Sequence, residues 1–333
     1  MNTVHTSLKS GDPVKTTFKV TTILINVILL LLRIALLLKK NEVLETLSKL
    51  DAFKNGLHNK SQTSLQKYAV FACCWCFMHT ITIVIITTAE IFINTDNYLT
   101  VHPFVGRKST WDQKLYFFIY MAGHSTIYLM NFLVFPGLII ILLSFIYLSF
   151  VKTFQMHLEA LRIRLLERFS KEEISRALAI FTVAKKTHLN IEKSLQLFSF
   201  LAYVLIFSNI LQMISGIVTN FMSDKGMMQV MYTYVTLGVA IVWFIALTLC
   251  GTQVGKTEVL IRNLSQDVIT KNFAKEVDGH KKLVYMNLFN ACTNFELKFT
   301  GCGMFVVDKK LFLTVTGIMV TYGVLFATEV SKM

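Results

Sequence analysis

Proline and charge are both scarce in this chain. Its 333 residues include 3 prolines, and charged residues make up 16% of the sequence while hydrophobic residues make up 54%. So little charge beside so many apolar residues excludes an ordinary soluble domain and is typical of a multi-pass membrane protein. The few prolines, and the lack of any run rich in glycine and serine, argue against long linkers. We therefore predict an all-α polytopic membrane protein in which residues 1–333 form a single membrane domain.

The chain has a formal net charge of +13, but this charge does not indicate a nucleic-acid partner. The basic residues lie in loops between apolar stretches, where the retention of positive loops on the inner side of a membrane explains them better. Cysteine is also sparse, with 6 residues in total, and none has partners at metal-ligand spacing. We expect reduced thiols, no metal site, no cofactor and no nucleic-acid partner.

Six apolar stretches are long enough to cross a bilayer, which takes roughly 20 residues. They are residues 20–38, 69–93, 115–150, 196–221, 227–250 and 311–330. The third stretch is ambiguous because it is nearly twice the necessary length. It could be two helices that turn at Pro136-Gly137, or one long helix that continues past the membrane.

The distribution of basic residues favours one long helix. Residues 39–68 contain six lysines against three acids, and 151–195 and 251–310 contain nine basic residues each, whereas 94–114 contain three and 222–226 one. With one helix over 115–150, all three basic loops fall on the same side, as the positive-inside rule requires. This predicts six spans with both termini outside, a kink near Pro136, and a helix that extends into the cytosol.

Two features of these helices invite closer inspection. Phe154, Leu158, Leu161 and Leu165 recur at helical spacing beyond the end of the third span, so they form a stripe that needs a partner surface.

Arg33 lies inside the first apolar stretch, before Lys39-Lys40. Its long side chain is expected to reach toward the inner boundary.

The C-terminal residues carry the most specific pattern in the chain. Phe299-Thr300-Gly301-Cys302-Gly303-Met304-Phe305 is followed by Asp308-Lys309-Lys310-Leu311 and then by an apolar helix with Thr321-Tyr322. Five apolar residues come next, and Thr328-Glu329 stands where a Gln-Phe pair would complete the pattern. This order resembles the C-terminal signature of the insect gustatory receptor family, within the superfamily of insect gustatory and odorant receptors. Leu47–Asp51, Thr187–Asn190 and Leu197–Phe200 add weaker support.

The resemblance implies a tetrameric, ligand-gated, non-selective cation channel in the plasma membrane of chemosensory neurons. It implies homo- or hetero-tetramers with related subunits, small-molecule tastants as ligands, an extracellular C-terminus, and cytoplasmic helices that form a shared anchor. The family has seven spans, so the six counted here lead us to expect that the counterpart of its first helix is absent.

The resemblance also implies that the last span lines the pore. Its candidate pore or gate residues are Thr314, Thr321, Tyr322, Phe326, Thr328 and Glu329. A ring of Glu329 carboxylates at the outer mouth would concentrate cations. Glu329 at the helix end is equally compatible with simple solvation, and Tyr322 with packing between helices.

A ligand pocket is predicted in the outer half of the bundle. Its core is an aromatic stripe of Tyr116, Tyr120, His124 and Tyr128, and the outer ends of other spans could add Thr87, Glu90, Thr219, Tyr232 and Thr236. Aromatic walls with a few hydrogen-bonding groups suit a small molecule. Anchoring at the lipid headgroups is the competing explanation, and it accounts best for Tyr116 and Tyr120.

Other classes of membrane protein fit less well. A G-protein-coupled receptor would need an odd number of spans, and a transporter commonly has internal repeats and broken helices, which this sequence lacks. An enzyme would need His, Asp, Glu or Cys converging within the membrane, and no such set is evident. We predict a receptor rather than an enzyme, with a transporter or a G-protein-coupled-type receptor as the alternative.

Overall fold

The computed structural model describes residues 13–55, 63–93, 111–218, 227–273 and 296–330, with scattered positions between 283 and 293. Nearly all of these residues are helical. The elements are α2 (Pro13–Asn55), α3 (Thr63–Ile93), α5 (Trp111–Leu129), the π-helical turn η2 (Met130–Val134), α6 (Phe135–Glu167), α7 (Lys171–Val218), α8 (Met227–Phe273), β1 (Thr300–Gly301), β2 (Phe305–Val306) and α10 (Lys309–Val330).

Five described helical segments are long and apolar enough to cross a membrane. They are Val20–Lys54, Gln66–Ala89, Leu115–Glu167, Lys171–Ile217 and Tyr234–Lys271, and each overlaps one predicted span. The sixth predicted span, 311–330, lies in α10. The prediction of an all-α polytopic membrane protein is confirmed, whereas the number of spans and their orientation stay predictions.

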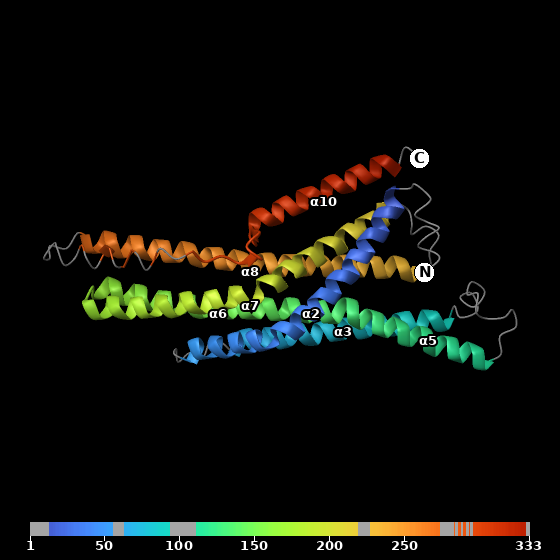
Figure 1. Ribbon diagram of the computed structural model, residues 1–333, viewed down its shortest axis with the longest axis horizontal. Helices are drawn as coiled ribbons and strands as arrows, with labels where there is room; N and C mark the ends of the chain where they lie inside the picture. The colour runs from blue at the N-terminus through green and yellow to red at the C-terminus, as the bar shows by residue number, and fades with distance from the viewer. Residues whose placement is uncertain are drawn as a thin grey trace.

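Residues 111–167 form one continuous helical run, not two helices joined at Pro136-Gly137. The run is interrupted only by η2, which ends two residues before Pro136. Proline lacks the backbone N–H that an α-helix needs, and a π turn is a common way to absorb such a break. Figure 1 shows α5 continuing from α6 with a small change of direction.

The C-terminal part of α6, the N-terminal part of α7 and the C-terminal part of α8 run side by side, at the end of the bundle away from α10 (Figure 1). The stripe of Phe154, Leu158, Leu161 and Leu165 is fully buried between these helices. Phe181 of α7 packs edge-on against Phe154, with ring centroids 5.9 Å apart. The expected partner surface of the stripe is therefore supplied by the chain itself.

Helix α2 lies along α7 for much of its length. Two polar contacts join these helices at different levels: the Thr46 and Ser194 hydroxyls are 2.9 Å apart, and the Gln212 amide donates to the Thr22 hydroxyl at 2.6 Å. Such bonds between apolar helices fix their register, because an unpaired polar group is costly in hydrocarbon.

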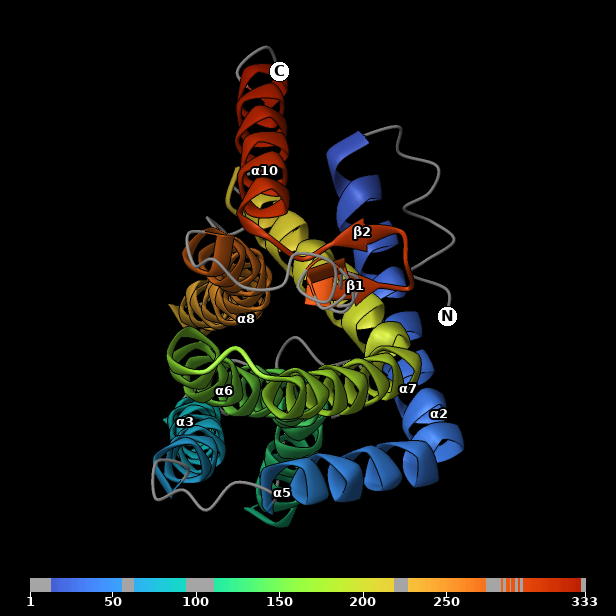
Figure 2. The ribbon, with the colours of Figure 1, turned by 90° about the vertical axis from the view of Figure 1, so that its left-hand side faces the viewer.

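Helix α10 diverges from the bundle. In Figure 2 it projects away from the other helices, beyond the β1–β2 hairpin. Only its first turns and one face touch α7 and α8, through residues such as Phe312, Val315 and Met319. Most described side chains of the last helix are thus exposed in a single chain.

Candidate functional site at the base of the last helix

A short hairpin redirects the chain into α10. Thr300 pairs with Val306 and Gly301 with Phe305, in antiparallel register. Cys302 and Gly303 form the turn with φ of 52° and 70°. Two successive positive φ values are typical of a type I′ hairpin turn, which explains a glycine at this point of the signature. Partial desolvation raises the pKa of the Cys302 thiol, so this thiol is neutral at physiological pH.

A carboxylate on α7 holds the first strand of this hairpin. Glu192 Oε1 accepts hydrogen bonds from the Thr300 backbone N–H at 2.9 Å and from the Thr300 hydroxyl at 3.0 Å. One turn further along α7, the Gln196 carbonyl accepts the Cys302 N–H at 3.3 Å. We call these contacts the Glu192 lock. They tie the segment before α10 to a helix that the sequence places more than 100 residues away.

Close packing completes the attachment. Phe299 lies against the fully buried Tyr147 of α6, with ring centroids 4.0 Å apart, and Phe305 packs on Tyr203 of α7 at 5.5 Å. On α8, a side chain at Gly251 would place Cβ 1.8 Å from the Val307 carbonyl oxygen. Only glycine fits where α8 meets the chain entering α10.

The start of α10 is capped and packed. The Asp308 carboxylate accepts the Leu311 backbone N–H at 2.8 Å, as expected of an N-cap aspartate. One turn in, Phe312 stacks on Phe244 of α8 at 5.0 Å between centroids. The signature residues therefore build a fixed base from which α10 departs.

The predicted pore residues lie on the uncovered part of α10. Thr314, Thr321 and Thr328 are exposed, and Tyr322 keeps 47% of its surface accessible. The hydroxyls of Thr321 and Thr328 bond to carbonyls within their own helix. The side chains of Phe326 and Glu329 lie outside the described residues.

The described residues of the predicted pocket lie on three helices, with the aromatic stripe on α5, Thr87 on α3 and Thr236 on α8. Tyr116 and Tyr120 are 75% and 57% exposed on α5, and His124 is exposed and stacks on Tyr120 at 6.2 Å. Tyr128 is 39% exposed and stacks on Phe132 at 4.2 Å. The stripe thus faces outward from a single chain.

The other predicted pocket residues are scattered. The Thr87 hydroxyl bonds to the Ile83 carbonyl in its own helix. Thr236 is buried in α8, and its hydroxyl has no hydrogen-bond partner among the described residues. Thr219 and the side chains of Glu90 and Tyr232 lie outside the described part of the chain.

The sequence analysis did not predict the hollows that the structure contains. One is an apolar groove of about 460 Å³ between the C-terminal end of α3 and the facing part of α5, with Thr88, Phe92 and Phe118 in its wall. Its residues read as ordinary membrane-helix sequence, so no pattern distinguished them.

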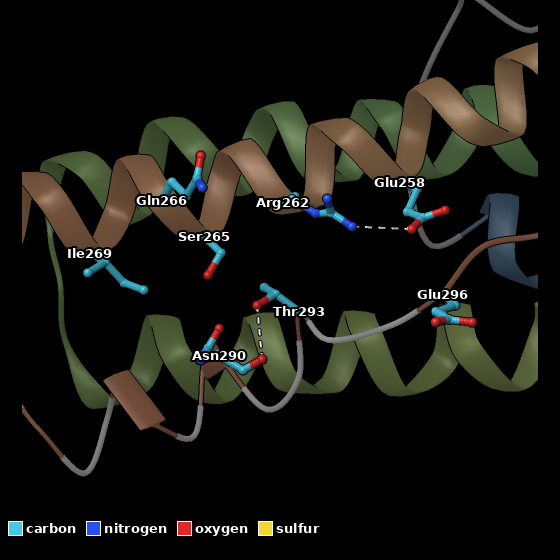
Figure 3. Close-up of a pocket in the computed structure, with 8 residues that line it drawn as sticks. All are labelled: Glu258, Arg262, Ser265, Gln266, Ile269, Asn290, Thr293 and Glu296. Atoms are coloured by element: carbon cyan, nitrogen blue, oxygen red, sulfur yellow. Dashed lines mark hydrogen bonds and ion pairs between the residues drawn. The ribbon is translucent and has the colours of Figure 1, made fainter.

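Another hollow is polar and lies at the C-terminal part of α8, with a volume of about 320 Å³ (Figure 3). Figure 3 shows Arg262 and Ser265 of α8 facing Asn290 and Thr293 across it. Arg262 pairs with Glu258 at 3.6 Å, and Glu296 at the rim pairs with Lys298 at 2.6 Å, which lowers the pKa of Glu296. The charges at this pocket are thus largely neutralised within the chain.

Comparison with solved structures identifies the architecture. The alignment with the insect olfactory receptor OR5 from Machilis hrabei covers 95% of this chain and 82% of the receptor chain. Its TM-score is 0.62, and the sequence identity is 15%. The chain has the fold of an insect olfactory receptor. The alignment with the same receptor in complex with eugenol covers 94% of this chain and 88% of the receptor chain, with a TM-score of 0.55 and 14% sequence identity. Comparisons with protein-family models and with curated proteins find no match.

The olfactory-receptor fold agrees with the resemblance seen in the C-terminal signature. At this low identity, the two observations rest on different features: one on a few residues near α10, and the other on the path of nearly the whole chain.

Within the described residues, no group of three or more His, Cys, Asp or Glu could hold a metal ion.

Proposed function

We propose that the chain is a member of the insect chemoreceptor superfamily and a subunit of a ligand-gated, non-selective cation channel that responds to small-molecule tastants. The observation that carries this proposal is the olfactory-receptor fold over nearly the whole chain, with the gustatory-type signature located at the base of α10. The proposed location is the plasma membrane of chemosensory neurons, with the C-terminus outside.

The exposure of α10 supports a pore formed by several subunits. Apolar residues such as Leu313, Val320 and Val324 are exposed beside the exposed threonines. In a homo- or hetero-tetramer, neighbouring subunits would cover the apolar side, and Thr314, Thr321 and Thr328 could face a central axis. Hydroxyl groups in such a position would contact permeating ions or their water.

The pore assignment is tested by permeation. We expect cells expressing the chain, with a related subunit if required, to pass a tastant-evoked cation current. Glu329→Gln should lower the permeability of calcium relative to sodium by roughly two-fold or more, because removing an acidic ring weakens local cation enrichment. The measurement is the reversal potential in mixed calcium and sodium solutions.

Glu45→Gln is the matched control, since Glu45 is an exposed carboxylate paired with Lys49 far from α10. Equal reversal potentials for Glu329→Gln and the unaltered chain would remove Glu329 from the pore. The absence of any current in an assembled tetramer would contradict the channel itself.

We further propose that the ligand binds among the outer ends of the helices. Here the aromatic stripe from Tyr116 to Tyr128 lies on α5, and eugenol, the ligand named for the OR5 complex, is a small aromatic molecule. The exposure of the stripe in one chain means that a neighbouring helix, subunit or ligand would have to cover it. Tyr116, Tyr120, His124, Tyr128, Thr87, Glu90, Thr219, Tyr232 and Thr236 remain the candidate contacts.

Substitution of the deeper pair tests this location. His124→Ala and Tyr128→Ala should each raise the half-maximal tastant concentration about five-fold to thirty-fold, as expected for losing a stacking or hydrogen-bond contact. Tyr68→Ala, at an exposed tyrosine of α3 that is not among the candidate contacts, serves as the control for simple membrane anchoring. Dose–response curves that coincide for all three variants and the unaltered chain would exclude the stripe from binding.

A further inference from the structure

An arginine lies within the apolar part of the bundle without a carboxylate partner. Arg33 is in the apolar stretch of α2, six residues before Lys39 and hence about 9 Å from it along the helix. Its guanidinium donates to the Asn131 side-chain oxygen at 2.7 Å and lies 5.2 Å from the centroid of the Phe135 ring. The side chain therefore reaches across to α5–α6 instead of extending to the inner boundary as the sequence analysis expected.

These partners do not neutralise the charge. An amide oxygen and an aromatic face are weak counterparts for a full positive charge in hydrocarbon, and arginine has five N–H donors in a planar fork. Among the described residues, no acid lies within ion-pair distance of Arg33. Intramembrane charges of this kind usually face a partner or a pathway, so the missing counter-charge calls for an explanation.

The surroundings of Arg33 are open on one side. Arg33 itself is half-buried, and its neighbours one turn away on α2, Leu30 and Leu37, are 55% and 78% exposed. On the facing element, Met130 and Tyr128 are also partly exposed. Arg33 is thus bordered by apolar side chains that a hydrocarbon chain could cover.

The facing element is irregular at the point of contact. Asn131 belongs to η2, the only π-helical turn in the described residues, and Phe135 begins α6 directly after it. π turns inside α-helices are frequent at functional sites because they re-aim side chains and leave backbone groups less regularly paired. The charge, the irregular turn and the open apolar border coincide at one place.

We propose that Arg33 binds the anionic headgroup of an amphiphile, a carboxylate or phosphate whose hydrocarbon chain lies along Leu30 and Leu37. The guanidinium fork matches both oxyanions in a bidentate arrangement. Asn131 and Phe135 hold the guanidinium in position between binding events. The anion can come from a free carboxylate amphiphile or from a membrane phospholipid, and both present the same oxyanion chemistry.

Native mass spectrometry of the purified full chain in neutral detergent tests the proposal with three probes. These are oleate, dioleoyl phosphatidic acid and dioleoyl phosphatidylcholine, the last being a lipid without net charge. We expect Arg33→Gln to weaken binding of the anionic probes about tenfold or more, the loss expected for a hydrogen-bonded charge pair. Arg33→Lys should retain only part of the affinity, because an ammonium keeps the charge but lacks the planar fork. Arg262→Gln, at an exposed arginine outside the apolar region, should change nothing.

The two sources give different results. Arg33-dependent retention of oleate without phosphatidic acid assigns the site to free carboxylate amphiphiles, and retention of phosphatidic acid assigns it to lipid headgroups. Equal binding of all probes to the unaltered chain and to Arg33→Gln would overturn the proposal. The proposal would also be overturned if Asn131→Ala and Arg33→Gln lowered the stability of the protein equally while the binding of the probes stayed the same. That result would give Arg33 a purely structural role.

A second measurement applies if Arg33→Gln fails to fold. A photoreactive fatty acid with a diazirine on its chain, irradiated with the unaltered protein, should label peptides that contain Leu30 or Leu37. Labelling confined to other helices would overturn the assignment. Both tests use the purified protein without current measurements, so their outcome is independent of the channel function proposed above.

Discussion

Replacement of Gly251 by alanine is expected to destabilise the base of α10 severely. The added methyl group would lie 1.8 Å from the Val307 carbonyl oxygen and 2.7 Å from its carbonyl carbon, so α8 or the backbone entering α10 must move. We expect a loss of about 3 kcal/mol, the upper end of the usual cost of overpacking. The melting temperature of the detergent-solubilised chain, followed by size-exclusion chromatography after heating, measures this loss.

Gly255 provides a matched control on the same helix. It is exposed, and a side chain there would meet nothing within 4 Å. Since alanine is the better helix former by about 1 kcal/mol, Gly255→Ala should leave stability unchanged or raise it slightly. We expect the melting temperature to fall in Gly251→Ala and to stay unchanged or rise slightly in Gly255→Ala. Equal behaviour would mean that the contact between α8 and Val307 does not hold the last helix in place.

Removal of the Glu192 carboxylate is expected to have the second large effect. Glu192→Ala leaves the Thr300 N–H and hydroxyl without their acceptor. Thr300 is buried, so water cannot readily replace the lost carboxylate. Hydrogen bonds to charged groups contribute about 1.5–3 kcal/mol, so the free energy of unfolding should fall by about that amount. Thr300→Val, which keeps the backbone bond and loses the hydroxyl, should cost less.

A double-mutant cycle distinguishes loss of the contact between Glu192 and Thr300 from an unrelated loss of stability. If the bond between Glu192 and Thr300 is the cause, the combined variant should be less destabilised than the sum of the single variants, because both remove the same contact. Glu45→Ala, at an exposed carboxylate on α2, should leave unfolding unchanged. Strict additivity of the Glu192 and Thr300 variants would show that the bond between the Glu192 carboxylate and the Thr300 hydroxyl contributes nothing.

Two features of α6 followed from the sequence. The stripe from Phe154 to Leu165 indicated a buried helix face from neighbouring residues alone, and comparison of the basic loops along the chain indicated a single helical run across 115–150. The C-terminal signature lies at the base of α10. Its residues form the hairpin and cap that place α10.

The contacts that organise the site could not be predicted in the same way. Glu192 and Thr300 are 108 residues apart, and nothing near either residue indicates the other. The aromatic stripe on α5 shows a related limit. Helical spacing placed four side chains along that helix but gave no information on what covers them. Among the described residues, nothing encloses Tyr116 or Tyr120.

The π turn before Pro136 sets the angular phase of the outer half of the bundle. It contains one more residue per hydrogen-bonded loop than an α turn, and one residue corresponds to a rotation of about 100° around the helix axis. Deleting a single residue within Met130–Val134 would therefore return this turn to the α form and keep the faces of α5 in place, whereas deleting one residue from the regular helix at the start of α6 would turn the whole of α5 by that angle relative to α6. The side chains of Tyr120, His124 and Tyr128 would then face different neighbours, although none of them had been changed. In this fold, an insertion or deletion of one residue can reassign an entire helix face in a single step.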